Sequence, residues 1–365
     1  MAPKGKSRQL YLIPVLSKAL DILEMLQQSQ GMTLESIHKQ TGISKTTVYR
    51  ILKSFVHRGY VSQSADGAYR HVTRQKKLRF GFGSQSSEMP FAIAVEKSLR
   101  KAAAAVGVDL LVLDNSYDGA TAVANAEKFV QNQVDVVIEC QIDQHVAPII
   151  ADRIAAANIP MIAVDIPHPH AIYFGVDNYR VGYAVGEVLA EHSLERWKGK
   201  IDWIIGLDLA EAGPMVQSRI TGVFEALRNR LPETPVECFV RIDTRGLRDK
   251  SSTAVLEFLK RHPKDRRILI AAANDTAALG AIDAVRKLGR EKQVAVAGHD
   301  CVEEMIAELR RNDSPAVASV SHEVSQYGEY LMRLGLSLLR GEIVPPYNFT
   351  QYEVVSRENL PASGS

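Results

Sequence analysis

The sequence predicts an α/β protein in two parts: a small helical domain closed by a β-hairpin, and a larger two-lobed domain built on doubly wound parallel sheets. Its 365 residues exceed one ordinary domain. Apolar residues recur at helical spacing near the amino terminus, whereas from residue 78 short apolar runs alternate with longer helical stripes. The net charge also differs between the two parts. Residues 1–77 carry 13 Lys and Arg against 4 Asp and Glu, whereas residues 78–365 carry 31 Lys and Arg against 38 Asp and Glu.

The small domain is organised around one predicted helix with an apolar face. Val48, Ile51, Leu52 and Phe55 follow one another at i, i+3, i+4 and i+7. The other face is polar and basic, and such groups reach the phosphate oxygens and major-groove base edges of DNA. Ser44 is a natural N-cap for this helix. The residues that we predict to contact DNA on it are Ser44, Lys45, Thr46, Thr47, Tyr49, Arg50 and Lys53.

The flanking residues complete a winged helix-turn-helix. A first apolar stripe between Val15 and Leu26 is followed by a short helix that Thr33 can cap. Gly42 can take the positive φ of the tight turn that precedes the recognition helix. Two short strands joined by a hairpin turn at Asp66-Gly67 then predict a wing. Arg70, on the second of these strands, completes the predicted set of DNA contacts.

These segments resemble the winged helix-turn-helix of IclR-type transcriptional regulators. The resemblance covers about residues 12–69, and its most diagnostic part is the run from residue 44 to residue 52. It implies a protein that binds double-stranded operator DNA. Any three-helix bundle has similar stripes, and a basic helix face is often merely solvated, so the turn and wing residues carry the distinction.

The large domain places polar side chains where its predicted strands end. Alternating strands and helices predict a mostly parallel sheet in each of two lobes, and ligands of open α/β sheets bind at the carboxyl edge. Any one of these residues is better explained as a helix cap, but the set suits a ligand rich in hydroxyl groups. The residues are Ser84, Asp114, Glu139, Asp165, Asp208, Asp243, Asn274 and Asp300.

Several stretches of this domain resemble the type I periplasmic-binding-protein fold, in its ribose-binding and lac-repressor-like branch. The strongest is the run Asn274-Asp275-Thr276-Ala277-Ala278-Leu279-Gly280. The resemblance implies a carbohydrate effector held between one lobe of about residues 78–176 and 322–345 and another of about residues 178–321 and 346–360. By the same resemblance, the ligand-binding residues are Gln85, Phe91, Asp165, Arg219, Asn274, Asp300 and His322.

Some of these positions admit two interpretations. Arg219 and Asp300 are either a charged pair in a closing cleft or a structural salt bridge. His322 is either a protonated contact to an acidic sugar or a structural histidine, with its hydrogen bonds satisfied, where the chain crosses between the lobes. Ile166 and Met89 stand where pentose binders of this fold carry Arg and Asn, which argues against ribose itself.

The sequence offers little for catalysis. The run from Gly81 to Ser86 lacks the third glycine of a dinucleotide fingerprint. His168 and His170 flank a proline without a nearby third metal donor. We therefore expect no enzyme activity, no cofactor and no metal. Three widely separated cysteines and the lack of a membrane-length apolar run predict a cytoplasmic protein without a membrane partner.

These patterns predict a ligand-responsive transcriptional regulator, with a repressor preferred, that acts as a homodimer or a tetramer. Its predicted parts are a basic, flexible N-terminus (1–10), the winged helix-turn-helix (11–71), a basic linker (72–77) and the ligand-binding domain (78–360). The alternative is a cytoplasmic carbohydrate-binding protein, or an α/β enzyme, without a DNA-binding role.

Overall fold

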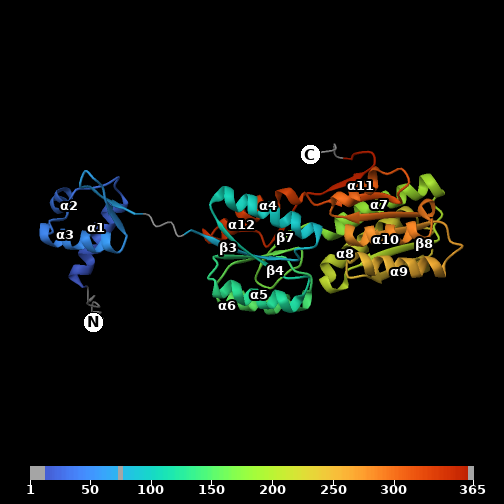
Figure 1. Ribbon diagram of the computed structural model, residues 1–365, viewed down its shortest axis with the longest axis horizontal. Helices are drawn as coiled ribbons and strands as arrows, with labels where there is room; N and C mark the ends of the chain where they lie inside the picture. Colours follow the sequence, from blue (N-terminus) through green and yellow to red (C-terminus); the bar gives the residue numbers. More distant parts are fainter. Residues whose placement is uncertain (1–12, 73–76, 361–365) are drawn as a thin grey trace, which may run out of the picture. The chain divides into compact units, whose positions relative to one another are not determined.

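The computed structural model describes residues 13–72 and 77–360, and the chain divides into two compact units, Met1–Lys76 and Lys77–Ser365 (Figure 1). The predicted basic N-terminus, residues 1–10, lies outside the described residues. So do residues 73–76, which are most of the predicted linker.

The first unit consists of three helices and a β-hairpin, as predicted. Thr33 caps the second helix by accepting a hydrogen bond from the Ser36 backbone N–H, and Gly42 ends that helix with a φ of 68°. The hairpin strands are antiparallel, and the turn between them contains Gly67 at a φ of 79°. The elements are α1 (Pro14–Gln27), α2 (Leu34–Thr41), α3 (Lys45–His57), β1 (Val61–Gln63) and β2 (Tyr69–His71).

The apolar stripes of the three helices meet in one core. Ile22, Leu26, Ile37, Val48 and Leu52 are fully buried, and all belong to the same cluster. Since Val48 and Leu52 of α3 point inward, the polar face of that helix is left facing outward. The predicted helix-turn-helix with its wing is therefore confirmed.

The second unit contains two six-stranded sheets, one in each lobe (Figure 1). Neighbouring strands are parallel, except that β12 and β14 are antiparallel. The first lobe has the strand order β13-β7-β6-β5-β3-β4, with β3 (Arg79–Ser84), β4 (Asp109–Asp114), β5 (Val136–Glu139), β6 (Met161–Val164), β7 (Ile172–Gly175) and β13 (Tyr347–Phe349). The second has the order β14-β12-β11-β10-β8-β9, with β8 (Trp203–Asp208), β9 (Phe239–Asp243), β10 (Ile268–Ala272), β11 (Val294–His299), β12 (Ala316–Ser321) and β14 (Glu353–Ser356).

Helices cover both faces of each sheet, which confirms the doubly wound arrangement (Figure 1). In the first lobe, α4 (Pro90–Val106) and α12 (Val324–Leu339) cover one face, and α5 (Gly119–Gln131) and α6 (Ala147–Ala156) cover the other. In the second lobe, the two faces are covered by α7 (Asn178–Trp197) and α8 (Pro214–Arg230), and by α9 (Arg248–Arg261), α10 (Asp275–Lys287) and α11 (Glu303–Arg310).

The chain crosses between the lobes after β7, after β12 and after β13. The third crossing differs from the predicted lobe boundary, because residues 346–360 do not all belong to the second lobe. Tyr347 pairs with Tyr173 of β7, so β13 is an edge strand of the first lobe, and the crossing follows it. Strand β13 has only three residues, and so short a segment shows no recognisable apolar periodicity in the sequence.

The segment before α9 is only partly a strand. Val236–Cys238 form a 3-10 turn, and Phe239–Asp243 join the sheet. Pro235 immediately precedes the turn. Since proline fixes its own φ and lacks an N–H, it cannot donate a hydrogen bond to the neighbouring strand.

Helices α7 and α8 approach each other closely through glycines. A Cβ atom on Gly182 would overlap the backbone carbonyl of Arg219, and one on Gly222 would overlap the carbonyl of Tyr179. Only glycine permits this contact between the two helix backbones. The contact sets the position of Arg219 on α8, and hence the direction in which its side chain leaves the helix.

We expect the substitution Gly182→Ala to destabilise the second unit. Alanine improves helix propensity by about 1 kcal/mol, but the forced separation of α7 and α8 is overpacking, which costs roughly 1–3 kcal/mol. Urea unfolding should therefore show a net loss of stability. Glu191→Ala, at an exposed position of the same helix, is the control and should change the midpoint little. A stabilised Gly182→Ala protein would contradict the proposed packing constraint.

Candidate functional site

The outer face of α3 carries the residues predicted to contact DNA. Ser44 caps the helix, accepting a hydrogen bond from the Thr47 backbone N–H at 3.4 Å, and its hydroxyl lies 2.9 Å from that of Thr47. Tyr49, Arg50 and Lys53 are exposed, and the Lys53 ammonium lies 5.6 Å from the centre of the Tyr49 ring. Lys45 and Thr46 are also exposed. These residues therefore form one accessible polar surface with three positively charged side chains, Lys45, Arg50 and Lys53.

Two of the predicted DNA contacts have partners within the unit. Lys45 forms an ion pair with Glu35 at 2.5 Å, with both side chains about half exposed; such surface pairs are weak and easily exchanged for another anion. Arg70 donates from Nε to the carbonyl of Gln30 at 3.1 Å and lies 3.5 Å from the carboxylate of Asp66. Arg70 thus holds the wing against the loop after α1, and its guanidinium is less available to a phosphate than that of Arg50.

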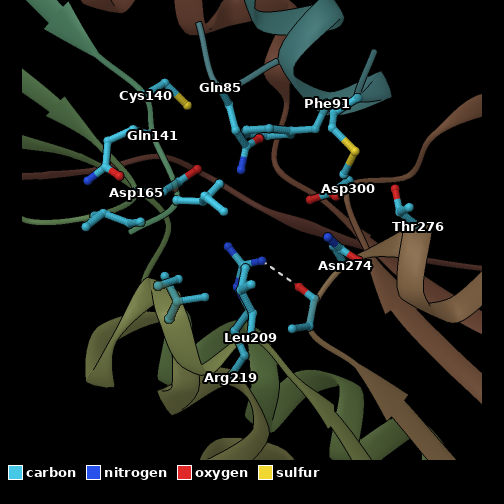
Figure 2. A pocket seen from close by; sticks show the side chains of 16 residues that line it. Gln85, Phe91, Cys140, Gln141, Asp165, Leu209, Arg219, Asn274, Thr276 and Asp300 are labelled. Carbon is cyan, nitrogen blue, oxygen red and sulfur yellow. Dashed lines mark hydrogen bonds between the residues drawn. The ribbon is translucent and has the colours of Figure 1, made fainter. Parts of the chain in front are cut away.

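A cavity lies between the two lobes of the second unit, and six of the seven predicted ligand-binding residues line it (Figure 2). Gln85, Phe91 and Asp165 reach it from the first lobe. The second lobe contributes Arg219, Asn274 and Asp300. The remaining lining residues are Met89, Cys140, Gln141, Ile142, Ile166, Leu209, Ala212, Val216, Ala273 and Thr276.

Arg219 is buried at the floor of this cavity and held in a fixed orientation. Its Nε donates to the side-chain oxygen of Asn178 at 2.6 Å, and its Nη1 donates to the carbonyl of Ala273 at 2.7 Å. Figure 2 shows the guanidinium pointing between Asp165 and Asp300. The possible structural salt bridge between Arg219 and Asp300 is not formed among the described residues, because these hydrogen bonds hold the guanidinium elsewhere.

Asp165 and Asp300 stand on opposite sides of Arg219. Both have left-handed backbone conformations, with φ values of 61° and 108°, at sharp turns after β6 and β11. Burial raises the pKa of Asp165 to about 6, although Arg219 opposes the shift. Burial likewise raises the pKa of Asp300 to about 7; Arg219 opposes this and the charge of Asp165 adds to it. The cavity therefore holds two carboxyl groups that are poorly solvated when ionised.

Asn274 combines a structural role with a place in the cavity wall. Its side-chain oxygen caps α10 by accepting from the Ala277 backbone N–H at 2.8 Å. The amide nitrogen is turned toward the cavity in Figure 2. Capping and ligand contact are thus compatible here, because an amide has a donor and an acceptor at opposite ends.

His322 does not line the cavity, unlike the other six predicted residues. Its ring is fully buried behind Asp300, with Nδ1 3.7 Å from the Asp300 carboxylate, and neither ring nitrogen has a hydrogen-bond partner within the described part of the chain. Burial lowers the pKa of His322 well below its usual value, and the charge of Arg219 lowers it further. A neutral, enclosed imidazole fits neither interpretation drawn from the sequence, since it does not reach the cavity and is not satisfied by a hydrogen bond.

Several lining residues were not predicted. Gln141 follows β5, and its side-chain oxygen accepts from the Asp143 backbone N–H at 2.5 Å, which fixes the amide at the cavity edge. Thr276 lies within the run from Asn274 to Gly280 that carries the strongest resemblance of the large domain, so the sequence could have indicated it. The aliphatic residues Leu209, Ala212 and Val216 gave no such signal, because apolar residues beside a strand normally indicate core.

Other polar residues at strand ends bind backbone N–H groups of the adjoining loops or are buried away from the cavity. Asp208 accepts from the Leu209 backbone N–H and forms an ion pair with Arg241 at 2.7 Å, and Asp243 accepts from the Ala210 backbone N–H at 3.2 Å. Glu139 is fully buried away from the cavity, and this burial raises its pKa to about 8. Among these strand-end residues, Asn274 both caps a helix and lines the cavity, whereas Asp208, Asp243 and Glu139 do not line it.

The glycine run near the start of the domain does not form a phosphate-binding loop. Gly81 and Gly83 lie inside β3, where a Cβ would collide with the ring of Phe129 and the carboxyl of Glu139 respectively. Among residues 13–72 and 77–360, no group of three His, Cys, Asp or Glu side chains is arranged to hold a metal ion. Within the same residues, no helix has the length and apolar character needed to span a membrane.

Comparison with known proteins identifies both units. The family described as the periplasmic binding protein domain matches residues 80–343, well over half of the chain. The chain belongs to this family. The IclR helix-turn-helix domain matches residues 15–65. The two resemblances drawn from the sequence are thereby confirmed, and the chain joins a DNA-binding helix-turn-helix to a periplasmic-binding-protein domain.

Individual relatives of the periplasmic binding protein family are distant. The ribose import binding protein RbsB of Bacillus subtilis (strain 168) is 20% identical over 273 residues, which are 74% of this chain and 84% of that protein. A periplasmic solute-binding protein from Actinobacillus succinogenes 130z, solved with bound D-allose, has a TM-score of 0.68 at 19% identity, covering 77% of this chain and 98% of its own. GanP, a glucose-galactose binding protein from Geobacillus stearothermophilus, has a TM-score of 0.66 at 23% identity, with coverages of 79% and 100%. These likenesses establish the fold.

We expect Asp300→Asn to stabilise the unliganded protein at neutral pH. Because the pKa of Asp300 is raised from 3.8 to about 7, the folded protein keeps this proton at pH values where the unfolded chain has lost it. Stability is therefore lost as the pH rises from about 4 to about 7. The amide removes that loss, so the variant should gain roughly 1–3 kcal/mol at pH 8.

Urea unfolding of the two proteins between pH 5 and pH 8 measures this difference, which should narrow as the pH falls. Glu191→Gln, at an exposed position of α7, controls for the loss of one carboxylate and should show no such trend. An Asp300→Asn protein that is less stable than the wild type at pH 8 would show that the carboxylate is well accommodated without a ligand.

Proposed function

We propose that this chain is a one-component transcriptional regulator in which a carbohydrate-binding cleft controls a DNA-binding winged helix-turn-helix. The combination of the two domains on one chain carries the proposal, because an IclR helix-turn-helix has no use in solute transport. Since DNA is the partner, the protein acts in the cytoplasm. It has no catalytic role in this proposal and needs no cofactor.

On the DNA side, α3 enters the major groove of double-stranded operator DNA. Tyr49, Arg50 and Lys53 project from its exposed face, and Ser44, Thr46 and Thr47 surround its N-terminus, where backbone N–H groups favour a phosphate. Lys45 reaches the backbone by exchanging Glu35 for a phosphate. Arg70 contributes by fixing the wing more than by direct contact. Two copies of the chain bind together, since paired half-sites increase affinity and read a symmetric operator.

On the ligand side, the cavity suits a neutral compound with several hydroxyl groups. Asp165 and Asp300 accept hydrogen bonds from hydroxyls, Arg219, Gln85 and Asn274 donate to them, and the ring of Phe91 offers a flat apolar surface for a sugar face. The related proteins with bound D-allose and with glucose-galactose specificity support a carbohydrate.

The ligand and the DNA influence each other through the conformation of the sensor domain. A ligand changes DNA affinity only if it binds the DNA-competent form and the other form unequally. Coupling of about 1–3 kcal/mol, a 5- to 150-fold change, is typical. We favour repression with release by the ligand, by analogy with the lac-repressor-like branch of the fold.

Arg50→Ala should weaken binding to the DNA that flanks the gene encoding this chain. Loss of one phosphate or base contact should make the binding free energy less favourable by roughly 1–3 kcal/mol. If the contact is to a phosphate, the slope of log affinity against log salt concentration should also decrease by about 1. Fluorescence anisotropy at several salt concentrations measures both. Lys97→Ala removes one positive charge from the exposed surface of α4 and should leave binding unchanged. Wild-type protein that binds a sugar but no flanking DNA at low salt would favour a carbohydrate-binding role without DNA.

Arg219→Ala should separate sensing from DNA binding. A thermal-shift screen of pentoses, hexoses, polyols and sugar acids identifies a ligand, because a ligand that binds only the folded form raises the melting temperature. That ligand should change wild-type DNA affinity 5- to 150-fold. The variant should bind DNA normally without a ligand and lose both the thermal shift and the change in affinity. An unaltered thermal shift in the variant would mean that the ligand binds elsewhere.

A further inference from the structure

The interlobe cavity is lined by a polar set and an aliphatic set of side chains, which we call its polar wall and its apolar wall. Asp165, Arg219, Asn274 and Asp300 make one of them polar. The other consists of aliphatic side chains that line the cavity and also pack on one another. They are Ile166, Leu209, Ala212, Val216 and Ala273, none more than 7% exposed, and they form a hydrophobic cluster separate from the cores of the two lobes.

Both lobes build this apolar wall. Ile166 follows β6 in the first lobe, whereas Leu209 and Ala212 follow β8 and Val216 lies in the first turn of α8 in the second. Ile142 of the first lobe also lines the cavity. Since these side chains come together from both sides of the cleft, the wall is a feature of the assembled ligand site. It is distinct from the ring of Phe91, which alone would serve one apolar face of a sugar.

A hydroxyl group placed against this wall would lose its hydrogen bonds to water and find no partner among aliphatic side chains. Each such buried, unsatisfied polar group is strongly unfavourable. A methyl group at the same point would instead bury apolar surface, which is favourable. The wall therefore disfavours a ligand that is hydroxylated on every edge.

The charges of the cavity also disfavour an anionic ligand. Arg219 is the positively charged side chain that lines it, and the carboxyl groups of Asp165 and Asp300 already face that guanidinium. His322, which we considered as a partner for an acidic sugar, is fully buried outside the cavity wall. A ligand carboxylate or phosphate would thus meet two carboxyl groups without a second cation.

We propose that the cleft selects a neutral deoxy sugar, one whose exocyclic edge carries a methyl group in place of a hydroxymethyl or carboxylate group. The hydroxyls of the ring are bound by the polar wall, and the methyl group lies against Ile166, Leu209 and Val216. This inference rests on the proposed sugar-sensing function and narrows it to one class of sugar.

Three matched series of D sugars test this selection on the full-length protein. Each series shares one ring configuration and differs only at C6: D-fucose, D-galactose and D-galacturonate; 6-deoxy-D-glucose, D-glucose and D-glucuronate; and D-rhamnose, D-mannose and D-mannuronate. Isothermal titration calorimetry at pH 7.5 measures the affinities. In the series that fits the polar wall, the methyl sugar should bind about 10- to 100-fold more tightly than the hydroxymethyl sugar, the range expected for an extra hydroxyl in an apolar pocket. The carboxylate should bind most weakly.

Val216→Thr and Ile166→Thr place a hydroxyl in the apolar wall with little or modest change of volume. Each should lower the preference for the methyl sugar at least fivefold, because the new hydroxyl can pair with that of the ligand. Val188→Thr, on α7 away from the cavity, is the matched control and should leave the preference unchanged. If both wall variants fail to fold, as judged by their melting transitions, the wild-type comparison alone decides.

The outcomes distinguish this inference from the proposed function. A preference for the hydroxymethyl or carboxylate sugar, or variants that fold and keep the wild-type preference, would overturn the selection of a deoxy sugar while leaving a sugar sensor in place. The same holds if pentoses or polyols bind and none of the nine sugars does. A protein that binds no carbohydrate in the wider screen would contradict the sensor itself.

Discussion

The interlobe cavity depends on one buried positive charge, the guanidinium of Arg219. Asp165 and Asp300 face each other from different lobes, and without a cation between them their mutual repulsion would add to the loss of hydration. Arg219 is itself held by Asn178 and the carbonyl of Ala273. The arrangement is therefore a network in which each member limits where the others can lie.

The position of that guanidinium is decided by helix packing. Gly182 of α7 lies directly against the backbone of α8 at Arg219, and Gly222 makes the reciprocal contact with α7. Asn178, at the start of α7, is then within reach of Arg219 Nε. A change of helix spacing would alter the electrostatics of the cleft without changing any residue that lines it. The glycines of α7 and α8 therefore help to determine the arrangement of charges in the cavity.

The raised pKa values of Asp165 and Asp300 mean that the cavity disfavours the ionised form of both carboxyl groups. Ionised carboxyl groups in a partly desolvated cleft reduce the stability of the folded state at neutral pH. Hydroxyl groups of a ligand would supply the hydrogen bonds that water no longer provides. In the proposed sensor, binding energy would then be concentrated in the form in which both carboxyl groups engage the ligand.

Sequence patterns were enough to predict the two-part architecture, the helix α3 with its polar face and most of the polar residues that line the cavity. Periodicity separates helices from parallel strands, and a polar residue such as Asp165 or Asp300 at a strand end must lie at the carboxyl edge of its sheet. Only the tertiary contacts pair Asp208 with Arg241, enclose His322 behind Asp300 and place β13 in the first lobe. It also assembled the apolar wall from Ile166 and Val216, which are far apart in the chain. The physical reason is that local pattern reports which face of an element is buried, whereas contacts between lobes depend on how separate elements pack.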